Sequence, residues 1–429
     1  MNLKKNNFIA KLFKKKPKLE PVIYDARASD LWPSNFHSHA LKVIEILQKK
    51  GYQAYIVGGG IRDQLMNLHP KDFDVVTNAL PEQIKKCFDR AIIIGKRFRL
   101  VHVYFGKRDF VEVATFRKDH ALAKHKSEGA LRQGGIISRD NVYGSIEDDA
   151  LRRDFTVNAF YYNPTTHELM DFSRGIEDFQ KRVLKLIGDP DARLKEDPVR
   201  ILRALRISNK LGFTIDEATF KAIPRHRNLL ASIAGGRLFD EYQKVLLHGQ
   251  AEKNFDTLQK MEILAILFPT VVCSLEEPYF AEMVRLALRN TDERYYAKKT
   301  INPAFLIGVF LWQELQVLKK KLSEKMSYKK AYHEAVKQTL WAQNKITSMP
   351  RYMTEMIEEV WALQRQMELR RPKNIMGILN HARYRAAYDF LLLRSEVGQV
   401  KPSLCEWWEK LYVMAEADRL GFIEKMPQK

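Results

Sequence analysis

The chain has few cysteines and no long apolar run. Cys87, Cys273 and Cys405 are the three cysteines in 429 residues, and their scattered positions argue against a disulfide framework or a zinc motif. The longest strongly apolar stretch, residues 305–312, is far shorter than the roughly 20 residues that cross a bilayer. We therefore expect a cytoplasmic protein, with a core helix at residues 305–312.

Acidic residues are in deficit. Lys and Arg number 72 against 52 Asp and Glu, a formal charge of +20, which favours a polyanionic partner: nucleic acid first, an acidic membrane surface second. The N-terminus lacks the apolar run of a secretory signal and predicts a flexible basic tail, which either tethers RNA or anionic lipid or is merely solvated. Its lysines are Lys4, Lys5, Lys11, Lys14, Lys15, Lys16 and Lys18.

A glycine turn separates two predicted elements. The apolar run 54–57 ends in Gly58, Gly59 and Gly60 and is followed by a helical pattern over 61–68. A strand, turn and helix in this order can receive a phosphate on backbone N–H groups and the helix N-terminus, with Arg62 as a nearby cation. A tight turn that needs positive φ is the plainer interpretation.

Asp72 and Asp74 follow this turn. If residues 72–76 form a strand, both carboxylates project from the same face, because residues i and i+2 of a strand do so. Mg²⁺ takes carboxylate oxygens and keeps positions for water and substrate phosphates. The pair therefore suggests metal-assisted phosphoryl chemistry.

Two later segments are rich in charge. Asp154 and Asn158 share a face if their segment is helical, and together they suit a ribose or a metal, although surface helices carry such mixtures routinely. Asp197 and Pro198 suit the cap and first position of a helix. Arg200, one turn later, adds a planar donor fork that suits the edge of a nucleobase.

The length favours two to four domains. Short apolar runs at 91–94, 99–105 and 110–116 alternate with helical patterns, as in a small α/β unit, whereas the sequence after residue 146 is mostly helical. Residues 118–143 are polar and basic, which predicts a long mobile loop over the site. The predicted domains are a basic tail at 1–35, a head at 36–175, a helical neck at 176–275 and an RNA-binding body and tail at 276–429.

Four motifs occur in a fixed order. They are Gly58-Gly59-Gly60-Ile61-Arg62-Asp63, Asp72-Phe73-Asp74-Val75-Val76-Thr77, Arg152-Arg153-Asp154-Phe155-Thr156-Val157-Asn158 and Glu196-Asp197-Pro198-Val199-Arg200. In this order and spacing they closely resemble the class II nucleotidyltransferases, which comprise bacterial poly(A) polymerases and CCA-adding tRNA nucleotidyltransferases. The resemblance covers about residues 40–270 and is weaker through the C-terminal helices.

The resemblance implies an α+β fold: a polymerase-β-like head with a mixed sheet, then helical neck, body and tail. It implies a polynucleotide adenylyltransferase in which an RNA 3′-hydroxyl attacks the α-phosphorus of ATP and pyrophosphate leaves. Asp72 and Asp74 would bind two Mg²⁺ ions. They would be the catalytic residues together with Asp154, the acidic position of the second motif. Glu112 is either a third acidic group near the metals or an exposed strand position. The implied nucleotide-binding residues are Gly58, Gly59, Arg62, Arg152, Arg153, Asn158, Glu196, Asp197 and Arg200.

The subfamily rests on finer features. The basic pair Lys96 and Arg97 before Phe98 resembles the poly(A) polymerase branch, as do residues 237–241 and 382–392. A CCA-adding enzyme and a catalytically silent RNA-binding protein of the same fold are the alternatives. Lys96, Arg97, Arg383 and Arg385 are weak RNA-binding candidates.

The expected partners are RNA 3′ ends of mRNA, regulatory RNA or decay intermediates, an RNA-decay machinery or RNA chaperone, and a membrane surface through the lysine tail. His37 and His39, or His120 and His125, could be drawn as metal ligands. No Cys or further His completes a set at zinc-like spacing, so we expect solvated histidines.

Overall fold

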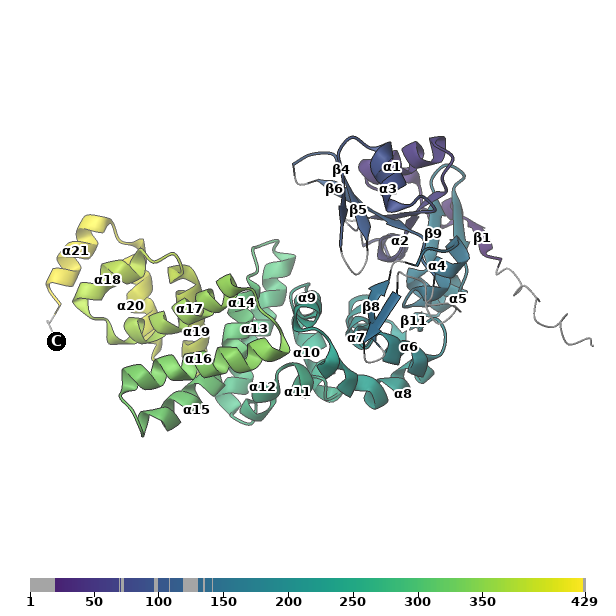
Figure 1. Cartoon of the computed structure of the whole chain (residues 1–429). Coiled ribbons are helices and arrows are strands. Elements are labelled where there is room, and N and C mark those ends of the chain that lie inside the picture. Colours follow the sequence, from purple (N-terminus) through teal and green to yellow (C-terminus); the bar gives the residue numbers. More distant parts are fainter. Residues whose placement is uncertain are drawn as a thin grey trace, which may run out of the picture. The chain divides into compact units, whose positions relative to one another are not determined.

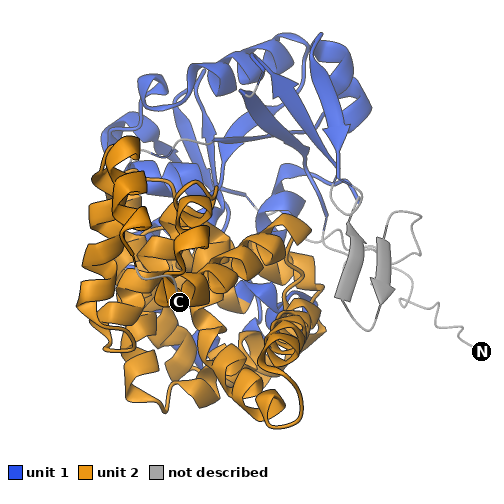
Figure 2. Ribbon diagram, turned by 90° about the vertical axis from the view of Figure 1, so that its left-hand side faces the viewer, with its two compact units in different colours: residues 1–200, 212–222 blue, residues 201–211, 223–429 orange. Residues whose placement is uncertain are grey.

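The structure is a computed structural model of the chain. It describes residues 20–68, 70, 73–95, 99–107, 109–118, 130–133, 136–140 and 142–426. The lysine-rich segment and three predicted site residues, Asp72, Lys96 and Arg97, lie outside these ranges. The chain divides into two compact units, residues 1–200 with 212–222 and residues 201–211 with 223–429 (Figure 2).

Unit 1 is built on an eight-stranded sheet in the order β1-β10-β9-β2-β3-β6-β5-β4. Figure 1 labels β1, β4, β5, β6 and β9 of this sheet. All neighbouring strands are antiparallel except β3 and β6, which are parallel, so the sheet is mixed, as expected. The strands are β1 (Val22–Asp25), β2 (Ala54–Val57), β3 (Asp74–Thr77), β4 (Ala91–Ile94), β5 (Leu100–Tyr104), β6 (Phe110–Thr115), β9 (Phe160–Asn163) and β10 (Glu168–Asp171).

Alternating side chains give the sheet two buried faces. Val75 and Ile56 pack into a large cluster with residues of α1 (Ser38–Lys49), α2 (Gly59–Leu65) and α3 (Pro81–Cys87). Val57 and Val76 pack on the other face with Ile146 and Ala150 of α4 (Ile146–Arg152). Helices therefore cover both faces of the sheet. Because successive side chains of a strand point to opposite faces, the position of a site residue along its strand decides which face it occupies.

Short elements complete unit 1. They are η1 (Ala26–Ser29), η2 (Pro33–Asn35), η4 (Thr156–Asn158), α5 (Gly175–Gln180), β11 (Val183–Leu184), α6 (Pro190–Glu196) and β12 (Thr214–Ile215), with β11 and β12 pairing in parallel. The helices α7 (Val199–Leu211) and α8 (Glu217–His226) run across the boundary between the two units.

Two predictions about unit 1 need correction. Residues 22–25 were assigned to the basic tail, but they form β1 and pair with β10. Val22, Ile23 and Tyr24 are residue types that favour strands. The predicted loop 118–143 contains an antiparallel pair, β7 (Ala130–Gln133) and β8 (Ile136–Asp140), with an irregular register between Leu131 and Arg132. Its remaining residues 119–129, 134–135 and 141 lie outside the described ranges.

Unit 2 is helical. Its elements after α8 are η5 (Arg227–Ser232), α9 (Gly235–Leu246), α10 (Ala251–Lys260), α11 (Leu264–Leu267), α12 (Pro269–Ser274), α13 (Pro278–Tyr296), α14 (Pro303–Phe310), α15 (Trp312–Ser323), α16 (Tyr328–Ile346), α17 (Arg351–Leu369), α18 (Pro372–Leu379), α19 (Tyr384–Glu396), α20 (Pro402–Val413) and α21 (Glu416–Glu424). The predicted core helix at 305–312 corresponds to buried α14 and the start of α15.

Cys87, Cys273 and Cys405 are free thiols. Among the described helices, none is both long enough and apolar enough to span a membrane.

Gly175 provides a test of packing in unit 1. A Cβ added there would lie 2.2 Å from the carbonyl oxygen of Thr156, a backbone atom that cannot rotate away. We expect Gly175→Ala to lower the free energy of unfolding by about 3 kcal/mol, measured by urea denaturation. The control is Gly106→Ala, whose Cβ would lie 3.7 Å from the nearest atom. Equal stability of the two variants would contradict the packing at Gly175.

Candidate active site

The glycine turn brings two charged side chains together. Gly58 follows β2 with φ +86°, a conformation that favours glycine, and α2 begins at Gly59. A Cβ at Gly58 would lie 3.6 Å from Arg153 Nη1 and 3.9 Å from Asp74 Oδ2. The glycine turn, a metal candidate and an arginine of the second motif thus converge on one point.

Asp74 has Glu112 as its counterpart on the neighbouring strand. Val75 pairs with Val113 in the parallel β3/β6 register, and both side chains lie on the α1 face of the sheet. Asp74 and Glu112 come one residue earlier on their strands, so both lie on the opposite face, toward α4. Adjacent strands are about 4.8 Å apart. Both residues are exposed, and Glu112 Oε1 lies 3.2 Å from His102 Nε2. Exposed carboxylates on neighbouring strands fit the oxygen-ligand preference of Mg²⁺, whereas the position of Asp72 is not described.

The first and second motifs are joined by hydrogen bonds. Arg62 is buried on α2; its Nη1 donates to Asn158 Oδ1 and its Nε to Asp63 Oδ1 at 2.9 Å. Asn158 Nδ2 donates to Asp154 Oδ1 at 3.0 Å. Asp154 and Asn158 therefore meet as predicted, but by a different route: α4 ends at Arg152, and Asn158 belongs to the short helix η4.

Asp149 holds Arg153 in place. Arg153 Nη2 donates to Asp149 Oδ2 at 2.9 Å and Arg153 Nε to the Tyr161 hydroxyl at 2.9 Å, while that hydroxyl donates to Asp149 Oδ2 at 2.7 Å. Burial opposes the charge on Asp149, but Arg153 and Arg152 outweigh it and lower the pKa of the Asp149 carboxyl below its usual range. Burial, and after it the nearby Asp149 carboxylate, raises the pKa of the Tyr161 hydroxyl, whereas Arg153 acts in the opposite direction. Arg153 is thus kept charged beside the glycine turn.

The third motif is tied to the second by Arg193. Buried Arg193 donates from Nη2 to the carbonyl oxygens of Arg152 at 2.6 Å and Arg153 at 2.8 Å, and from Nη1 to Glu196 Oε2 at 2.6 Å. Arg200 Nη1 donates to the same Glu196 oxygen at 2.9 Å and to the Arg193 carbonyl at 2.7 Å. Glu196 therefore positions two arginines.

Asp197 lies between α6 and α7, and its carbonyl oxygen accepts the backbone N–H of Arg200 at 3.1 Å. α7 begins at Val199, one residue later than predicted. The structure thus keeps Glu196, Asp197 and Arg200 within one helix junction.

Sequence reasoning missed Asp149, Tyr161 and Arg193. Asp149 lies four residues before Arg153, and Arg193 lies three residues before Glu196. Both spacings are typical of ion pairs on helices. Those spacings are common on solvated surfaces, so burial was needed to single them out. Tyr161, on β9, carries no local signal because its contacts are tertiary.

The weak RNA-binding candidates that are described lie in unit 2 and already have ion-pair partners. Arg383 Nε contacts Glu359 Oε2 at 2.9 Å, and Arg385 Nη2 contacts Asp389 Oδ1 at 3.0 Å. Arg385 remains 70% exposed. These pairs are consistent with a solvated face and leave RNA contact by either arginine a prediction.

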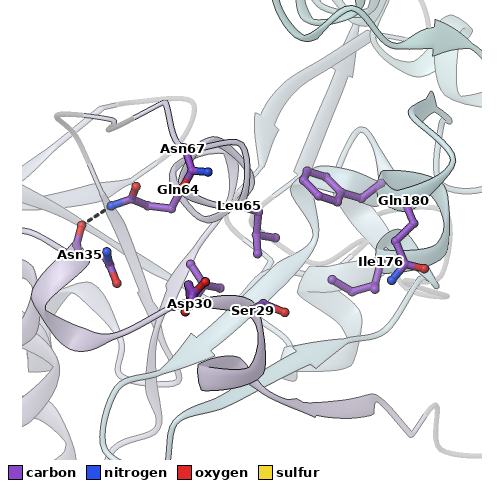
Figure 3. A pocket seen from close by; sticks show the side chains of 10 residues that line it. Ser29, Asp30, Asn35, Gln64, Leu65, Asn67, Ile176 and Gln180 are labelled. Carbon is purple, nitrogen blue, oxygen red and sulfur yellow. Dashed lines mark hydrogen bonds between the residues drawn. The ribbon is translucent and has the colours of Figure 1, made fainter.

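A pocket of about 310 Å³ lies elsewhere in unit 1 (Figure 3). Its lining includes Asn35, Gln64 and Gln180, and Gln64 Nε2 donates a hydrogen bond to the Asn35 carbonyl. None of the described residues predicted for the active site lines this pocket. The candidate site is therefore the open convergence at Gly58 and not this pocket.

Comparison with known proteins identifies the family. Sequence profiles described as "Poly A polymerase head domain", "Probable RNA and SrmB- binding site of polymerase A" and "Polymerase A arginine-rich C-terminus" match residues 54–185, 212–273 and 324–429. Poly(A) polymerase I of Haemophilus influenzae is 41% identical over 397 residues, which cover 90% of this chain and 87% of that protein. The chain belongs to the poly(A) polymerase family of nucleotidyltransferases.

Other members of the superfamily match less completely. A CCA-adding enzyme of Streptococcus pneumoniae is 37% identical over 215 residues, 50% of this chain and 51% of that enzyme. The solved CCA-adding enzyme of Bacillus stearothermophilus, in complex with CTP, superposes with a TM-score of 0.57 at 22% identity and covers 91% of this chain and 88% of that chain. The predicted family, the α+β fold and the nucleotidyltransferase class are confirmed.

Asp149→Asn tests the buried anchor of Arg153. The variant leaves a buried guanidinium without its ion pair, which we expect to lower the free energy of unfolding by about 3–5 kcal/mol. Tyr161→Phe keeps that ion pair and is the control, with an expected loss of about 1–2 kcal/mol. Both are measured by urea denaturation at neutral pH.

The pH dependence should separate these variants further. Because the pKa of Asp149 is lowered on folding, its contribution is present above an unfolded-state pKa of about 3.9 and is lost as pH falls through the lower folded value. The difference in free energy of unfolding between the wild type and Asp149→Asn should therefore become smaller as the pH falls below about 4. A difference that stays constant across this range would contradict the proposed ion pair.

Proposed function

We propose that this chain extends RNA 3′ ends with adenylate from ATP, without a template, as a polynucleotide adenylyltransferase. The observation that carries this function is the match to poly(A) polymerase I over 90% of the chain. The match to the CCA-adding enzyme covers 50%, so CCA addition is the weaker alternative. An exposed Asp74 beside the glycine turn argues against the second alternative, a catalytically silent RNA-binding protein.

In the proposed reaction, the RNA 3′-hydroxyl oxygen forms a bond to the α-phosphorus of ATP. The bond from that phosphorus to the β-phosphate oxygen breaks, and pyrophosphate leaves. Asp72 and Asp74 would hold the Mg²⁺ ions, two in number, with Glu112 as a third acidic group on the same face as Asp74. When bound, the ions lower the pKa of the attacking hydroxyl and neutralise the charge on the leaving pyrophosphate.

The arginines near the turn would bind the triphosphate. Asp149 and Tyr161 engage Nε and Nη2 of Arg153, so the third nitrogen, Nη1, is directed toward Gly58. Arg62 lies in the last turn of α2, is held by Asn158 and has its guanidinium beside Gly59, where its positive charge would favour a phosphate. Arg152 would add a further positive charge, and Gly59 leaves room for Arg62, because a Cβ there would lie 3.2 Å from Arg62 Nη2.

Base selection would rest on Asp197 and Arg200. In this proposal Glu196 does not meet the base, because its Oε2 accepts from Arg193 and Arg200. It orients the Arg200 fork toward the base edge and thus acts as a positioning residue. Asp154 and Asn158, joined at 3.0 Å, would contact the ribose.

The proposed cellular substrates are RNA 3′ ends. Unit 2 and the basic tail would grip the RNA, which includes mRNA, regulatory RNA and decay intermediates. A cytoplasmic location, contact with an RNA-decay machinery or RNA chaperone, and weak membrane-surface association through the N-terminal lysines are further proposals from the sequence.

Primer extension tests the proposed function. An unstructured A-rich oligoribonucleotide and a tRNA lacking its terminal CCA are each offered with Mg²⁺ and one nucleotide at a time. We expect long ladders on the oligonucleotide with ATP alone. Addition that stops after C, C and A, and only on the tRNA, would replace the proposal by CCA addition.

Carboxylate variants belong in the same assay. Asp72→Ala and Asp74→Asn should abolish incorporation while RNA affinity, measured by filter binding, stays within about twofold, because metal binding and RNA grip use different residues. Glu112→Gln should lower kcat with little change in KM for ATP. Full activity of either aspartate variant would contradict the proposed chemistry, and an unchanged kcat for Glu112→Gln would leave Glu112 as an exposed strand position.

Nucleotide choice tests the third motif. Arg200→Ala should relax or abolish the preference for ATP over CTP. Arg193→Lys keeps the charge but cannot hold two carbonyl oxygens and Glu196 together, so we expect the ATP preference to fall by about tenfold, the worth of one charge-assisted hydrogen bond. The matched control is Arg90→Lys, at an exposed arginine of the same unit. Unchanged kcat/KM ratios in the Arg193 variant would contradict its positioning role.

A further inference from the structure

A cluster of three potential metal ligands lies outside the active site. His37 and His39 stand at the start of α1, and Asp109 precedes β6. One ligand atom from each residue lies within 4.8 Å of the other two. The sequence prediction of solvated histidines considered only nearby Cys and His residues, and the third ligand is instead a carboxylate 70 positions away from His39.

The contact between His39 and Asp109 has an unusual geometry. His39 Nδ1 lies 2.9 Å from Asp109 Oδ2, yet this buried nitrogen makes no hydrogen bond with any described residue. The Asp109 oxygen therefore lies close to Nδ1 of His39 but outside the angular range of a hydrogen bond to that ring nitrogen. Two ligands of a tetrahedral zinc ion, each about 2.0–2.1 Å from the metal, lie roughly 3.3 Å apart with this same off-axis relation.

The three side chains are held by the fold. The ring of His39 stacks on Phe105, with 4.1 Å between ring centroids and 5° between planes. The turn that carries Asp109 is closed by hydrogen bonds from the Phe105 and Gly106 N–H groups to the Asp109 carbonyl, at 2.9 and 3.3 Å. His37 Nδ1 accepts the His39 backbone N–H at 3.4 Å, a weak contact that a metal ion can replace.

We propose that His37, His39 and Asp109 bind one divalent transition-metal ion of the zinc type, with water as the fourth ligand. Two imidazoles and one carboxylate are a common ligand set for Zn²⁺, whereas Mg²⁺ prefers oxygen ligands alone. The ion would link the first turn of α1 to the turn between β5 and β6. Its role is structural, and the proposal is independent of the polymerase reaction.

The site is distinct from the catalytic carboxylates. Asp109 precedes Glu112 by three residues, which is roughly 10 Å along a strand. His39 contacts Phe105, which packs with the α1 cluster, whereas Asp74 and Glu112 face the α4 side. In the test, Mg²⁺ competes with zinc for the carboxylates, and zinc binding that is lost in His39→Ala is assigned to the histidine site.

The test is calorimetric titration of ZnCl₂ into the chelator-treated full chain in millimolar Mg²⁺. We expect one zinc site in the wild type that is lost in His39→Ala and at least about tenfold weaker in Asp109→Asn. His333→Ala, at an exposed histidine of α16, is the control and should bind as the wild type does. Free cysteines are alkylated first, so that thiolates do not contribute.

A second measurement, the melting temperature with and without zinc, distinguishes loss of the metal site from failure of a variant to fold. Zinc should raise the melting temperature of the wild type and His333→Ala but not that of Asp109→Asn, whose amide keeps the shape of the carboxylate. The proposal is overturned if the wild type binds no zinc under these conditions, or if His39→Ala and Asp109→Asn bind it with wild-type affinity and stoichiometry. In that case the contact between His39 and Asp109 is an ion pair alone.

Discussion

Buried guanidinium groups are the constraint on which the active site depends. An arginine presents up to five N–H donors and keeps its charge, so burying it requires several acceptors nearby. In unit 1, Arg62 finds Asp63 and Asn158, Arg153 finds Asp149 and Tyr161, and Arg193 finds Glu196 and two backbone carbonyls. Arg62 and Arg193 both find acceptors in the second motif, at Asn158 and at the carbonyls of Arg152 and Arg153. Satisfying these donors therefore joins segments up to 96 residues apart in the sequence.

In the proposed function, this arrangement would prepare the site for a polyphosphate before one binds. If the arginines were held only by substrate, ATP binding would have to order several long side chains at once, at a cost of about 0.5–1.5 kcal/mol each. The protein carboxylates instead occupy some of the donors and direct others outward, as Arg153 shows with Nη1 facing Gly58. The glycine turn suits this geometry because it lacks a side chain at the point where Arg153 and Asp74 converge. Preorganised charge of this kind is what phosphoryl transfer demands of a protein.

Local signals predicted much of the head, and tertiary contacts explain what they missed. The runs 54–57 and 91–94 are strands with the predicted bounds, because apolar residues and flanking glycine fix such short elements. The contact between Asp154 and Asn158 was predicted from one shared helix face. It forms instead between a residue that follows α4 and a residue of the short helix η4. Arg193 was not predicted at all, because its acceptors are carbonyl groups some forty residues earlier and a backbone carbonyl leaves no trace in the sequence pattern. The β7/β8 hairpin was missed because its strands show no apolar alternation, although Gly134-Gly135, which stand between them in the sequence, are a two-residue hairpin signal.

The two proposed metal sites on the eight-stranded sheet would differ in ligand chemistry. The face toward α4 presents carboxylates from β3 and β6, oxygen ligands that suit an ion which must also hold substrate phosphates. The α1 side presents imidazoles, which a hard ion binds poorly and a zinc-type ion binds well. Strand β6 connects the two, since Asp109 stands just before it and Glu112 within it. An ion at His37, His39 and Asp109 would restrain the start of the strand that positions Glu112, so the order of β6 and the placement of the catalytic face are mechanically related even though the two ligand sets do not compete.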